Sequence, residues 1–477
     1  MRKSGVLLHI ASLPNDYGIG TMGREAYKFV DWLRSAGQSL WQILPLSQTS
    51  YGDSPYQSFS IFAGNPYFIS LETLEAEGLL QHDEYADIRW CEDPRYIDYA
   101  TMYENFYKVM KLAYGRFSKS KNGNVSEEYG KFLSENPWLE DYTLFMALKD
   151  AHKGKSWSEW EKPLRLRDAK AVVSAKKKYA REMDFYAFLQ FKFFQQWFKL
   201  KEYANSNGIE IIGDIPIYCA LDSADVWCEP RLFQLDKNRV PTVVAGFPPD
   251  AFSADGQLWG NPLYDWDYMD KNNYKWWIKR VQYSAKLFDL TRIDHFRGFE
   301  SFYAIPAGDK TAEHGEWLQG PSMKLFSAIK ADLGDVKLVA EDLGFLTDEV
   351  KAMLKAAGYP GMNVLEFGFG GEDSSYLPHN YVKNSVVYIG THDNETALGW
   401  YLAQDKAGKK RIRKYLGLDK SASDSKVVRE LIRCAYASVS ENCVIQMQDW
   451  LCLDNSARMN IPSTIGGGNW AWRMDKD

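Results

Sequence analysis

Residues 181–215 of the chain read REMDFYAFLQFKFFQQWFKLKEYANSNGIEIIGDI. Arg181–Asn207 repeats apolar residues at helical spacing and is followed by Gly208, a residue type that often terminates a helix. Ile209–Ile215 comes next and is apolar along most of its length. Such a strand is buried on both faces, as in parallel sheets that are covered by helices. This stretch therefore predicts an α/β fold of alternating helices and strands.

Seven further apolar runs extend this pattern: Val6–Ile10, Leu40–Leu44, Phe288–Asp294, Lys337–Asp342, Met362–Phe367, Ser385–Thr391 and Cys443–Met447. Segments with helical periodicity separate most of them, as in Arg24–Ala36, where a stripe of apolar side chains precedes a capping glycine, Gly37. Eight parallel strands with intervening helices are the number that closes a (β/α)8, or TIM, barrel. We therefore expect such a barrel.

The strands are unevenly spaced, which predicts insertions. About 160 residues separate the second and third strands and about 70 separate the third and fourth, more than an ordinary loop needs. We expect one barrel domain over residues 1–477, with large, mainly helical insertions after the second and third strands, at about residues 50–205 and at 216–286. Roughly 30 residues follow the last strand, so we expect no C-terminal β-sandwich.

The composition indicates a soluble globular protein. Hydrophobic residues make up 45% of the 477 residues and charged residues 25%, which excludes wholesale disorder. The 63 acidic and 57 basic residues leave a net charge of −6, which argues against a nucleic-acid-binding protein. No apolar run approaches the roughly 18 residues of a transmembrane helix, and the N-terminal run is too short for a signal peptide. We expect a cytoplasmic protein that binds neither nucleic acid nor membranes; the sequence does not indicate its oligomeric state.

One motif could indicate a dinucleotide cofactor. Residues 18–23, GIGTMG, match GxGxxG between a strand and a helix. The glycines begin well beyond the first strand, however, and no acidic residue ends the second strand to hold a ribose. We interpret the motif as a loop that needs positive φ or a close backbone approach. The six cysteines show no zinc-ligand spacing, and no calcium-loop motif is present, so we expect neither an organic cofactor nor a metal.

Acidic residues close three of the predicted strands. Asp294 ends the fourth strand, Glu341 and Asp342 end the fifth, and Asp393 ends the seventh. In (β/α)8 barrels the carboxyl ends of the strands meet at one face, where active sites lie. Each acid alone could cap a following helix. Three converging carboxylates would repel one another unless they are used, so their joint occurrence favours a catalytic site.

Charged and polar residues adjoin these acids. Arg292 and Asp294 are two residues apart on a strand, so both point to the same side, and the arginine would hold the carboxylate ionised. That environment suits a nucleophile. His295 and His392 adjoin two of the acids, and each could equally be an ordinary hydrogen-bonded loop histidine. The sequence lacks the motifs of serine hydrolases, P-loop NTPases and zinc proteases.

Two loops combine aromatic and polar residues. Residues 51–57, YGDSPYQ, follow the second strand, and residues 245–252, AGFPPDAF, lead to LWGNP at 258–262. Flat rings beside carboxamides and acids suit a sugar, which offers an apolar face and a polar rim. The same rings could instead pack beneath a loop.

Taken together, these segments resemble the amylomaltases, the 4-α-glucanotransferases of the α-amylase superfamily. The similarity runs in order through nearly the whole chain, in SLPNDYGIGTMG (12–23), SYGDSPYQSFS (50–60), GDIPIYCALDSADVW (213–227), AGFPPDAFSADGQLWGNPLY (245–264), RIDHFRGFESFYAIP (292–306), VAEDLG (339–344), THDNET (391–396), RMNIPS (458–463) and GNW (468–470). The resemblance implies a compact barrel enzyme without a cofactor, with maltooligosaccharides and α-1,4-glucans as donors and acceptors.

The resemblance also implies residue roles. Asp294 would be the nucleophile, Glu341 the general acid/base and Asp393 the transition-state stabiliser, with Arg292 orienting Asp294. The implied substrate-binding residues are Ser54, Tyr56, Asp214, Trp259, Arg292, His392 and Asn460.

The segment around Phe252 corresponds to a mobile cover in relatives, so the insertion at 216–286 would carry a substrate-cover loop. Two positions depart from the family pattern. Ala251 stands where some members have tyrosine, so a two-ring clamp over the acceptor is not expected. Ser463 replaces a common glycine.

The chemistry fits these residues independently of the resemblance. Retaining glycosyl transfer needs one ionised carboxylate to attack the anomeric carbon and one protonated carboxyl to donate to the leaving oxygen. Glu341, near other acids in a cleft, can have a pKa raised enough for the second task. We expect the Asp294 and Glu341 carboxyl groups to lie roughly 5–5.5 Å apart, as in retaining enzymes.

Two alternatives remain at this point. An α-1,4-glucan hydrolase would use the same three acids, because the acids do not specify the acceptor. A cover loop that excludes water, together with the amylomaltase loop motifs, favours transfer. A non-catalytic glucan-binding protein would need the aromatic residues but not all three carboxylates.

Overall fold

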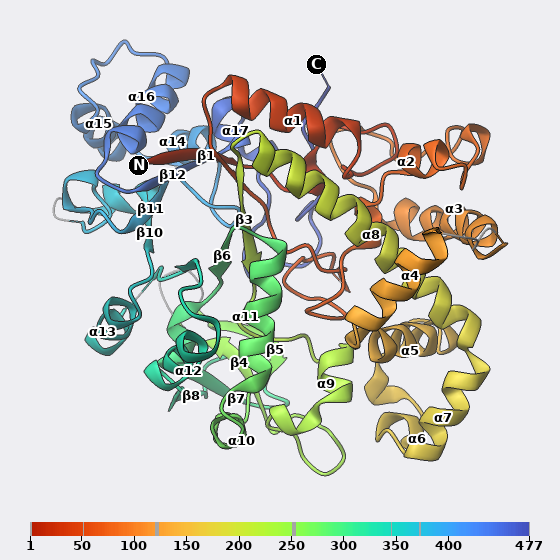
Figure 1. Cartoon of the computed structure of the whole chain (residues 1–477). Coiled ribbons are helices and arrows are strands. Elements are labelled where there is room, and N and C mark those ends of the chain that lie inside the picture. The colour runs from red at the N-terminus through yellow and green to blue at the C-terminus, as the bar shows by residue number, and fades with distance from the viewer. Residues whose placement is uncertain are drawn as a thin grey trace.

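The computed structural model describes residues 2–50, 52–119, 124–249, 254–344, 346–371 and 374–476. Eight parallel strands form a sheet at the centre of the molecule (Figure 1). They are β1 (Lys3–Leu7), β2 (Leu40–Gln42), β3 (Glu210–Ile215), β6 (Leu290–Ile293), β9 (Leu338–Ala340), β10 (Gly361–Val364), β11 (Ser385–Tyr388) and β12 (Asn442–Gln446).

The sheet is a nearly closed barrel. Its strand order is β10-β11-β12-β1-β2-β3-β6-β9. A backbone hydrogen bond of 2.9 Å from Ala340 N to Pro360 O joins the two ends of this order. Each of the eight predicted apolar runs overlaps one of these strands, so the predicted α/β barrel sheet is confirmed. β6, β9 and β11 end before the predicted runs do, so Asp294 and Glu341 directly follow their strands and Asp393 lies in the turn five residues after β11.

Helices surround the sheet. Those that follow or precede barrel strands are α1 (Arg24–Ser35), α8 (Ala180–Ser206), α11 (Lys275–Leu287), α12 (Met323–Leu333), α13 (Asp348–Ala357), α14 (Ala397–Ala403), α15 (Lys406–Tyr415), α16 (Asp424–Ala437) and α17 (Met447–Trp450). In α1 the predicted apolar stripe, Ala26, Phe29, Val30 and Leu33, is buried against the core, as its spacing indicates. Gly37 follows this helix with a left-handed φ of 68°, which explains the helix end.

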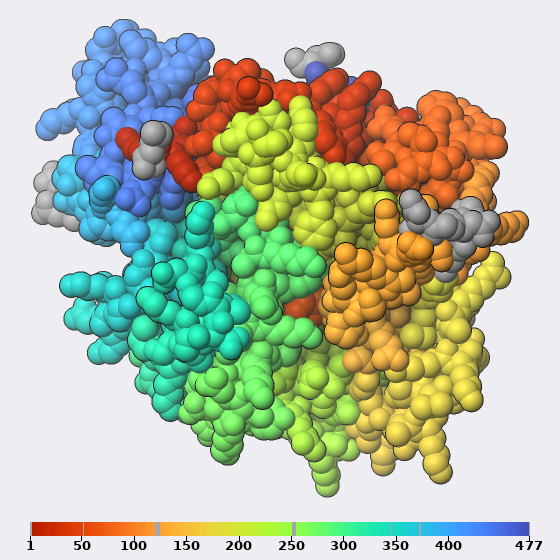
Figure 2. Space-filling model, viewed as in Figure 1, coloured from red at the N-terminus to blue at the C-terminus, as the bar shows by residue number. Residues whose placement is uncertain are grey.

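A group of helices between β2 and β3 lies to one side of the barrel, and it forms the orange and yellow part of the surface in Figure 2. It consists of α2 (Leu71–Ala76), α3 (Tyr99–Lys119), α4 (Asn124–Glu135), α5 (Trp138–Ala151), α6 (Lys162–Arg165) and α7 (Ala169–Lys178). Buried amides of α8 attach the start of this segment: the Gln190 and Gln196 Oε1 atoms each accept a 2.8 Å hydrogen bond, from Gly64 N and Ser70 N. The α8 helix therefore joins these helices to the barrel.

A second, antiparallel sheet departs from the prediction of mainly helical insertions. It consists of β4 (Val243–Phe247), β5 (Gln257–Pro262), β7 (Ser301–Pro306) and β8 (Glu316–Gln319), in the order β5-β4-β7-β8. The short helices α9 (Ala224–Cys228) and α10 (Trp266–Lys271) flank its first two strands in the chain. A 3-10 helix, Phe296–Phe299, connects barrel strand β6 to β7, so this sheet adjoins the strand end that carries Asp294.

The glycine-rich loop at residues 18–23 follows the interpretation made from the sequence. Gly18 has a φ of 83°, and a Cβ at Gly20 would collide with the carbonyl oxygen of Ile10. These two constraints explain the glycines without a dinucleotide. All six cysteines are free thiols. Among the helices of the described residues, none is both long enough and apolar enough to cross a bilayer.

Candidate active site

Arg292 holds two carboxylates at the carboxyl ends of neighbouring barrel strands. It lies on β6 directly beside Asp214 of β3, and its side chain is 3% exposed. Its Nη1 donates to Asp214 Oδ2 at 2.6 Å and its Nη2 to Asp294 Oδ1 at 2.9 Å. Asp214 is fully buried, whereas 30% of the Asp294 side chain is exposed. The arginine thus ties a buried acid to one that is open to a substrate.

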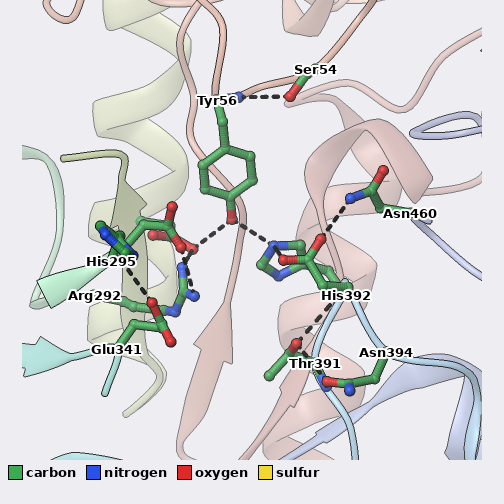
Figure 3. Close-up of polar contacts among 12 residues, drawn as sticks. Ser54, Tyr56, Arg292, His295, Glu341, Thr391, His392, Asn394 and Asn460 are labelled. Carbon is green, nitrogen blue, oxygen red and sulfur yellow. Dashed lines mark hydrogen bonds and ion pairs between the residues drawn. The ribbon is translucent and has the colours of Figure 1, made fainter. Parts of the chain in front are cut away.

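Tyr56 extends this network across the barrel mouth (Figure 3). Its hydroxyl donates to Asp214 Oδ2 at 2.8 Å and lies 2.9 Å from His392 Nε2. Because the hydroxyl proton points to Asp214, the tyrosine oxygen can accept a hydrogen bond from the Nε2–H of a neutral His392. Burial lowers the pKa of His392, which favours that neutral form. The two rings also stack, with centroids 5.3 Å apart.

Burial raises the pKa of Asp214 to about 7, and the Arg292 charge opposes this rise. The carboxylate has Arg292 and Tyr56 as donors on the same oxygen, Oδ2. The ionised form is therefore stabilised at only one of its two oxygens, by the buried Arg292 and the partly buried Tyr56.

Asp393 occupies the turn after β11. Asn460 Nδ2 donates to Asp393 Oδ1 at 2.6 Å, and His392 Nε2 lies 3.4 Å from Asp393 Oδ2. Arg458 donates to the Asp393 main-chain oxygen at 2.8 Å. Within the turn, Asn394 Oδ1 accepts hydrogen bonds of 2.9 Å from both the N and Oγ1 of Thr391. These contacts hold a carboxylate whose side chain is still 41% exposed.

Glu341 follows β9 and receives one backbone hydrogen bond on each carboxyl oxygen. His295 N donates to Oε2 at 2.8 Å and Leu343 N to Oε1 at 2.9 Å. Burial and, to a lesser extent, the nearby Asp294 charge together raise the pKa of Glu341 to about 7. Arg292 and the two N–H groups oppose that rise. Glu341 can therefore hold a proton near neutral pH while Asp294 is paired with an arginine.

The remaining predicted residues adjoin this network. Trp259 lies on β5 and packs edge-on against the His295 ring, with centroids 4.8 Å apart. Ser54 Oγ accepts a hydrogen bond of 3.3 Å from Tyr56 N, so it holds the loop that carries Tyr56. The contacts thus link all ten residues that the sequence analysis singled out as catalytic or binding residues.

The expectations for Ala251, Phe252 and Ser463 have different outcomes. Ala251 and Phe252 lie outside the described residues. Ser463, noted from the resemblance as standing in place of a glycine, has a φ of 64°, a left-handed conformation that glycine adopts without steric cost.

Two further residues that support the site, Trp470 and Arg458, were not predicted from the sequence. The buried Trp470 ring lies 5.8 Å from Tyr56 and 5.9 Å from His392, and Arg458 supports the Asp393 turn. Both come from the last segment of the chain, far from any strand. The RMNIPS and GNW segments of the resemblance were the signal that marked them.

The site offers hydrogen-bonding and acid–base groups but no metal cluster: within the described ranges, no three His, Cys, Asp or Glu side chains are arranged to hold a metal ion. A partly buried, protonatable carboxyl beside an arginine-paired carboxylate is the arrangement for protonating one atom of a substrate while another is attacked.

Comparison with known proteins gives one consistent result. Residues 8–477 match the model of glycoside hydrolase family 77, described as 4-alpha-glucanotransferase. The chain is 48% identical to the 4-alpha-glucanotransferase of Clostridium butyricum over 98% of this chain and 95% of that protein, and 49% identical to that of Streptococcus pneumoniae serotype 4 over 100% and 94%. The amylomaltase from Streptococcus agalactiae in complex with acarbose superposes with a TM-score of 0.97 at 43% identity, covering 100% of this chain and 96% of that one. The chain therefore belongs to the 4-alpha-glucanotransferases of glycoside hydrolase family 77.

Proposed function

We propose that this chain is an amylomaltase that transfers α-1,4-glucan segments between maltooligosaccharides or longer glucans with retention of the anomeric configuration. Membership of the family supports this activity. The observation that carries the mechanism is the contrast between two acids of the site. Asp294 is paired with the Arg292 guanidinium, whereas burial raises the pKa of Glu341 to about 7. Opposite environments for two carboxyl groups assign the nucleophile to the first and the acid to the second.

In the first step, a carboxylate oxygen of Asp294 attacks the anomeric carbon of the donor. The bond from that carbon to the glycosidic oxygen breaks as Glu341 gives its proton to this oxygen, and the shortened glucan leaves. The glycosyl unit remains covalently bound to Asp294. Asp393, open to the site, stabilises the positive charge that develops on the sugar ring.

In the second step, the 4-hydroxyl of an acceptor glucan attacks the same anomeric carbon. Glu341, now ionised, takes the hydroxyl proton, and the bond to Asp294 breaks. Both catalytic residues return to their starting protonation states. Two inversions at one carbon give net retention.

We assign the supporting roles as follows. Arg292 orients Asp294, while Asp214, His392 and Asn460 bind sugar hydroxyls, and the Tyr56 and Trp259 rings contact glucose units, with Ser54 at the edge of the same site. Their polar atoms already face one another in the hydrogen-bonded network, which is preorganised for a polyhydroxyl ligand. The related amylomaltase from Streptococcus agalactiae was solved with acarbose, which supports an oligosaccharide ligand here.

We also propose a single barrel domain with a helical insertion at about residues 50–205 and a second insertion at 216–286 that carries a substrate-cover loop. The order of the elements between β2 and β3 and between β3 and β6 supports this division. A cytoplasmic location is consistent with six free thiols, which suit a reducing compartment.

Incubation of the purified protein with maltotriose alone tests the proposed activity. A ladder of longer maltooligosaccharides together with released glucose is the expected result. Maltose and glucose without longer products would make water the acceptor and the protein a hydrolase. Unchanged maltotriose would contradict the proposal, and Asp294→Asn provides the inactive control.

A further inference from the structure

His295, the residue that follows Asp294, has a left-handed backbone with φ 53° and ψ 48°. This conformation is uncommon for residues other than glycine, although Asn, Asp and His adopt it more readily than most. Such outliers persist where the surrounding structure holds them, and they are concentrated at active sites. The contacts of the His295 backbone therefore indicate which neighbouring group this conformation positions.

The left-handed turn redirects the backbone from one neighbouring strand to the other. Asp294 N donates to Ile215 O of β3 at 3.0 Å. The next two N–H groups point to the opposite side: His295 N donates to Glu341 Oε2 at 2.8 Å, and Phe296 N donates to Glu341 O at 3.0 Å. A single residue thus allows the segment that carries Asp294 to bind the side chain of Glu341, as Figure 3 shows, and also its main chain.

The two hydrogen bonds on the Glu341 carboxyl have different consequences. The bond from Leu343 to Oε1 is local, because Leu343 is two residues away and moves with Glu341. The bond from His295 to Oε2 comes from the end of β6, next to Asp294. It therefore relates the orientation of the Glu341 carboxyl to the position of Asp294.

The His295 ring holds the turn in place from the other side. It packs edge-on against Trp259, with centroids 4.8 Å apart, and against Phe247, with centroids 6.2 Å apart. Burial lowers the pKa of the ring to about 3, so the ring is neutral at physiological pH and packs without a charge. The rings of the antiparallel sheet thereby contact the residue whose N–H reaches Glu341.

We propose that His295 is a positioning residue for Glu341: its left-handed backbone lets its own N–H and that of Phe296 both point to Glu341, and the bond to Oε2 fixes the carboxyl relative to Asp294, while Trp259 and Phe247 hold the ring. The catalytic meaning of this arrangement rests on the proposed function. His295 does not exchange a proton with the substrate in this account. Its effect is exerted through Glu341.

The surroundings of Glu341 set the expected pH response. Asp294 and Arg292 face it from the β6 end, and Tyr376 faces it from the loop after β10. Asp294 raises the pKa of Glu341, whereas Arg292 and the N–H groups of Leu343 and His295 lower it. Loss of the His295 bond removes one contact that favours the ionised carboxylate. The pKa of Glu341 then rises, and the alkaline limb of the kcat profile moves to higher pH.

The test compares two substitutions that both remove the ring but differ in backbone preference. His295→Asn retains a residue that tolerates left-handed conformations, whereas the β-branched His295→Val strongly disfavours them. We expect kcat of His295→Val for maltotriose disproportionation to fall about tenfold or more, with the alkaline limb shifted upward. His295→Asn should retain kcat within about threefold, with the limb in place. His295→Ala replaces the valine variant if the latter does not fold.

Titration of Glu341 by carbon-13 NMR, assigned with Glu341→Gln, gives a second readout that needs no substrate. A raised pKa of Glu341 in His295→Val and an unchanged one in His295→Asn would support the proposal. Equal behaviour of the two variants, in kcat and in the titration, would overturn it. Absence of transfer by the wild-type protein would instead refute the proposed function, and the titration would still decide whether His295 positions Glu341.

Discussion

The Arg292 guanidinium lies 2.9 Å from the Asp294 carboxylate, and the same buried group binds Asp214 at 2.6 Å. One planar side chain thus organises two acids with different exposure. We predict that Arg292→Lys lowers kcat/KM by about 100-fold, because an ammonium cannot reproduce the two directed bonds. It should also lower the free energy of unfolding by roughly 3 kcal/mol, since buried Asp214 loses much of its pairing. Steady-state kinetics measures the change in kcat/KM, and urea unfolding measures the change in the free energy of unfolding. The exposed Arg24→Lys is the control for both.

The pH dependence of the first chemical step follows from Glu341. Its pKa is raised to about 7, and it must hold a proton to act as an acid, so kcat should decline as the pH rises through about 7. An α-maltosyl fluoride donor carries a leaving group that needs no protonation. With this donor, the rate of enzyme glycosylation, measured in a rapid-mixing experiment, should lose that alkaline decline. Persistence of the decline would assign it to another group, such as Asp214, whose pKa is also raised to about 7.

Glu341 also makes stability depend on pH. Because its folded-state pKa exceeds the ordinary value of 4.5, the folded protein binds the proton more tightly than the unfolded chain. This contribution to the free energy of unfolding is fully present at pH values below the ordinary pKa of 4.5. It is lost as the pH rises through about 7. Glu341→Gln cannot ionise, so its advantage in free energy of unfolding over wild type should grow by about 2 kcal/mol from pH 5 to pH 8. Urea unfolding of wild type and variant at the two pH values measures this difference, and an equal gap between them at pH 5 and pH 8 would contradict it.

The Tyr56 hydroxyl connects Asp214 to His392, and a single substitution can remove this hydroxyl while the ring is kept. Tyr56→Phe keeps the ring that stacks on His392 but deletes the bonds to Asp214 and His392. We expect kcat to fall about tenfold, with a loss of unfolding free energy of roughly 1–2 kcal/mol. Tyr203→Phe, which deletes a hydroxyl bonded to Asp31 at the protein surface, is the matched control. An equal response of the two variants would show that the Tyr56 hydroxyl has no special role.

Asn460 bonds directly to an oxygen of Asp393 at 2.6 Å. Asn460→Ala removes this donor, whereas Asn460→Asp places a second negative charge against the first. We therefore expect Asn460→Asp to lose more activity than Asn460→Ala, about 100-fold against about tenfold in kcat. Initial rates with maltotriose near pH 7 give the comparison. A larger loss of kcat in Asn460→Ala than in Asn460→Asp would mean that the hydrogen bond from the amide does not support Asp393.

The barrel strands could be predicted from the sequence because burial on two faces requires continuous apolar runs, as in Ile209–Ile215. The strand-end position of Asp294 and Glu341 followed from the same runs. The antiparallel sheet was not predicted because β4 and β5 contain Gly246, Gly260 and Pro262, and because β4 pairs with β7 from a distant part of the chain. No local pattern shows such a pairing.

Some contacts of the site could likewise be predicted from the sequence, and others could not. The pairing of Arg292 with Asp294 could be predicted, since both lie on one strand two residues apart. Its second bond, to Asp214, depends on the register between β3 and β6, which the sequence does not display. Tyr56, Asn460 and Trp470 reach the site from loops whose course is set by tertiary packing. The left-handed backbone of His295 had no sequence signal at all, because histidine adopts this conformation only occasionally.

The most direct test of the account is to trap the covalent intermediate. In Glu341→Gln, an α-maltosyl fluoride donor can still glycosylate the nucleophile, but no base remains to activate an acceptor, so the adduct should accumulate. Mass spectrometry of the denatured and digested protein should find one maltosyl group on the peptide that contains Asp294, and none in Glu341→Gln/Asp294→Asn. An adduct on a different carboxylate, or turnover of the fluoride with no adduct and with inverted product, would contradict retaining transfer through Asp294.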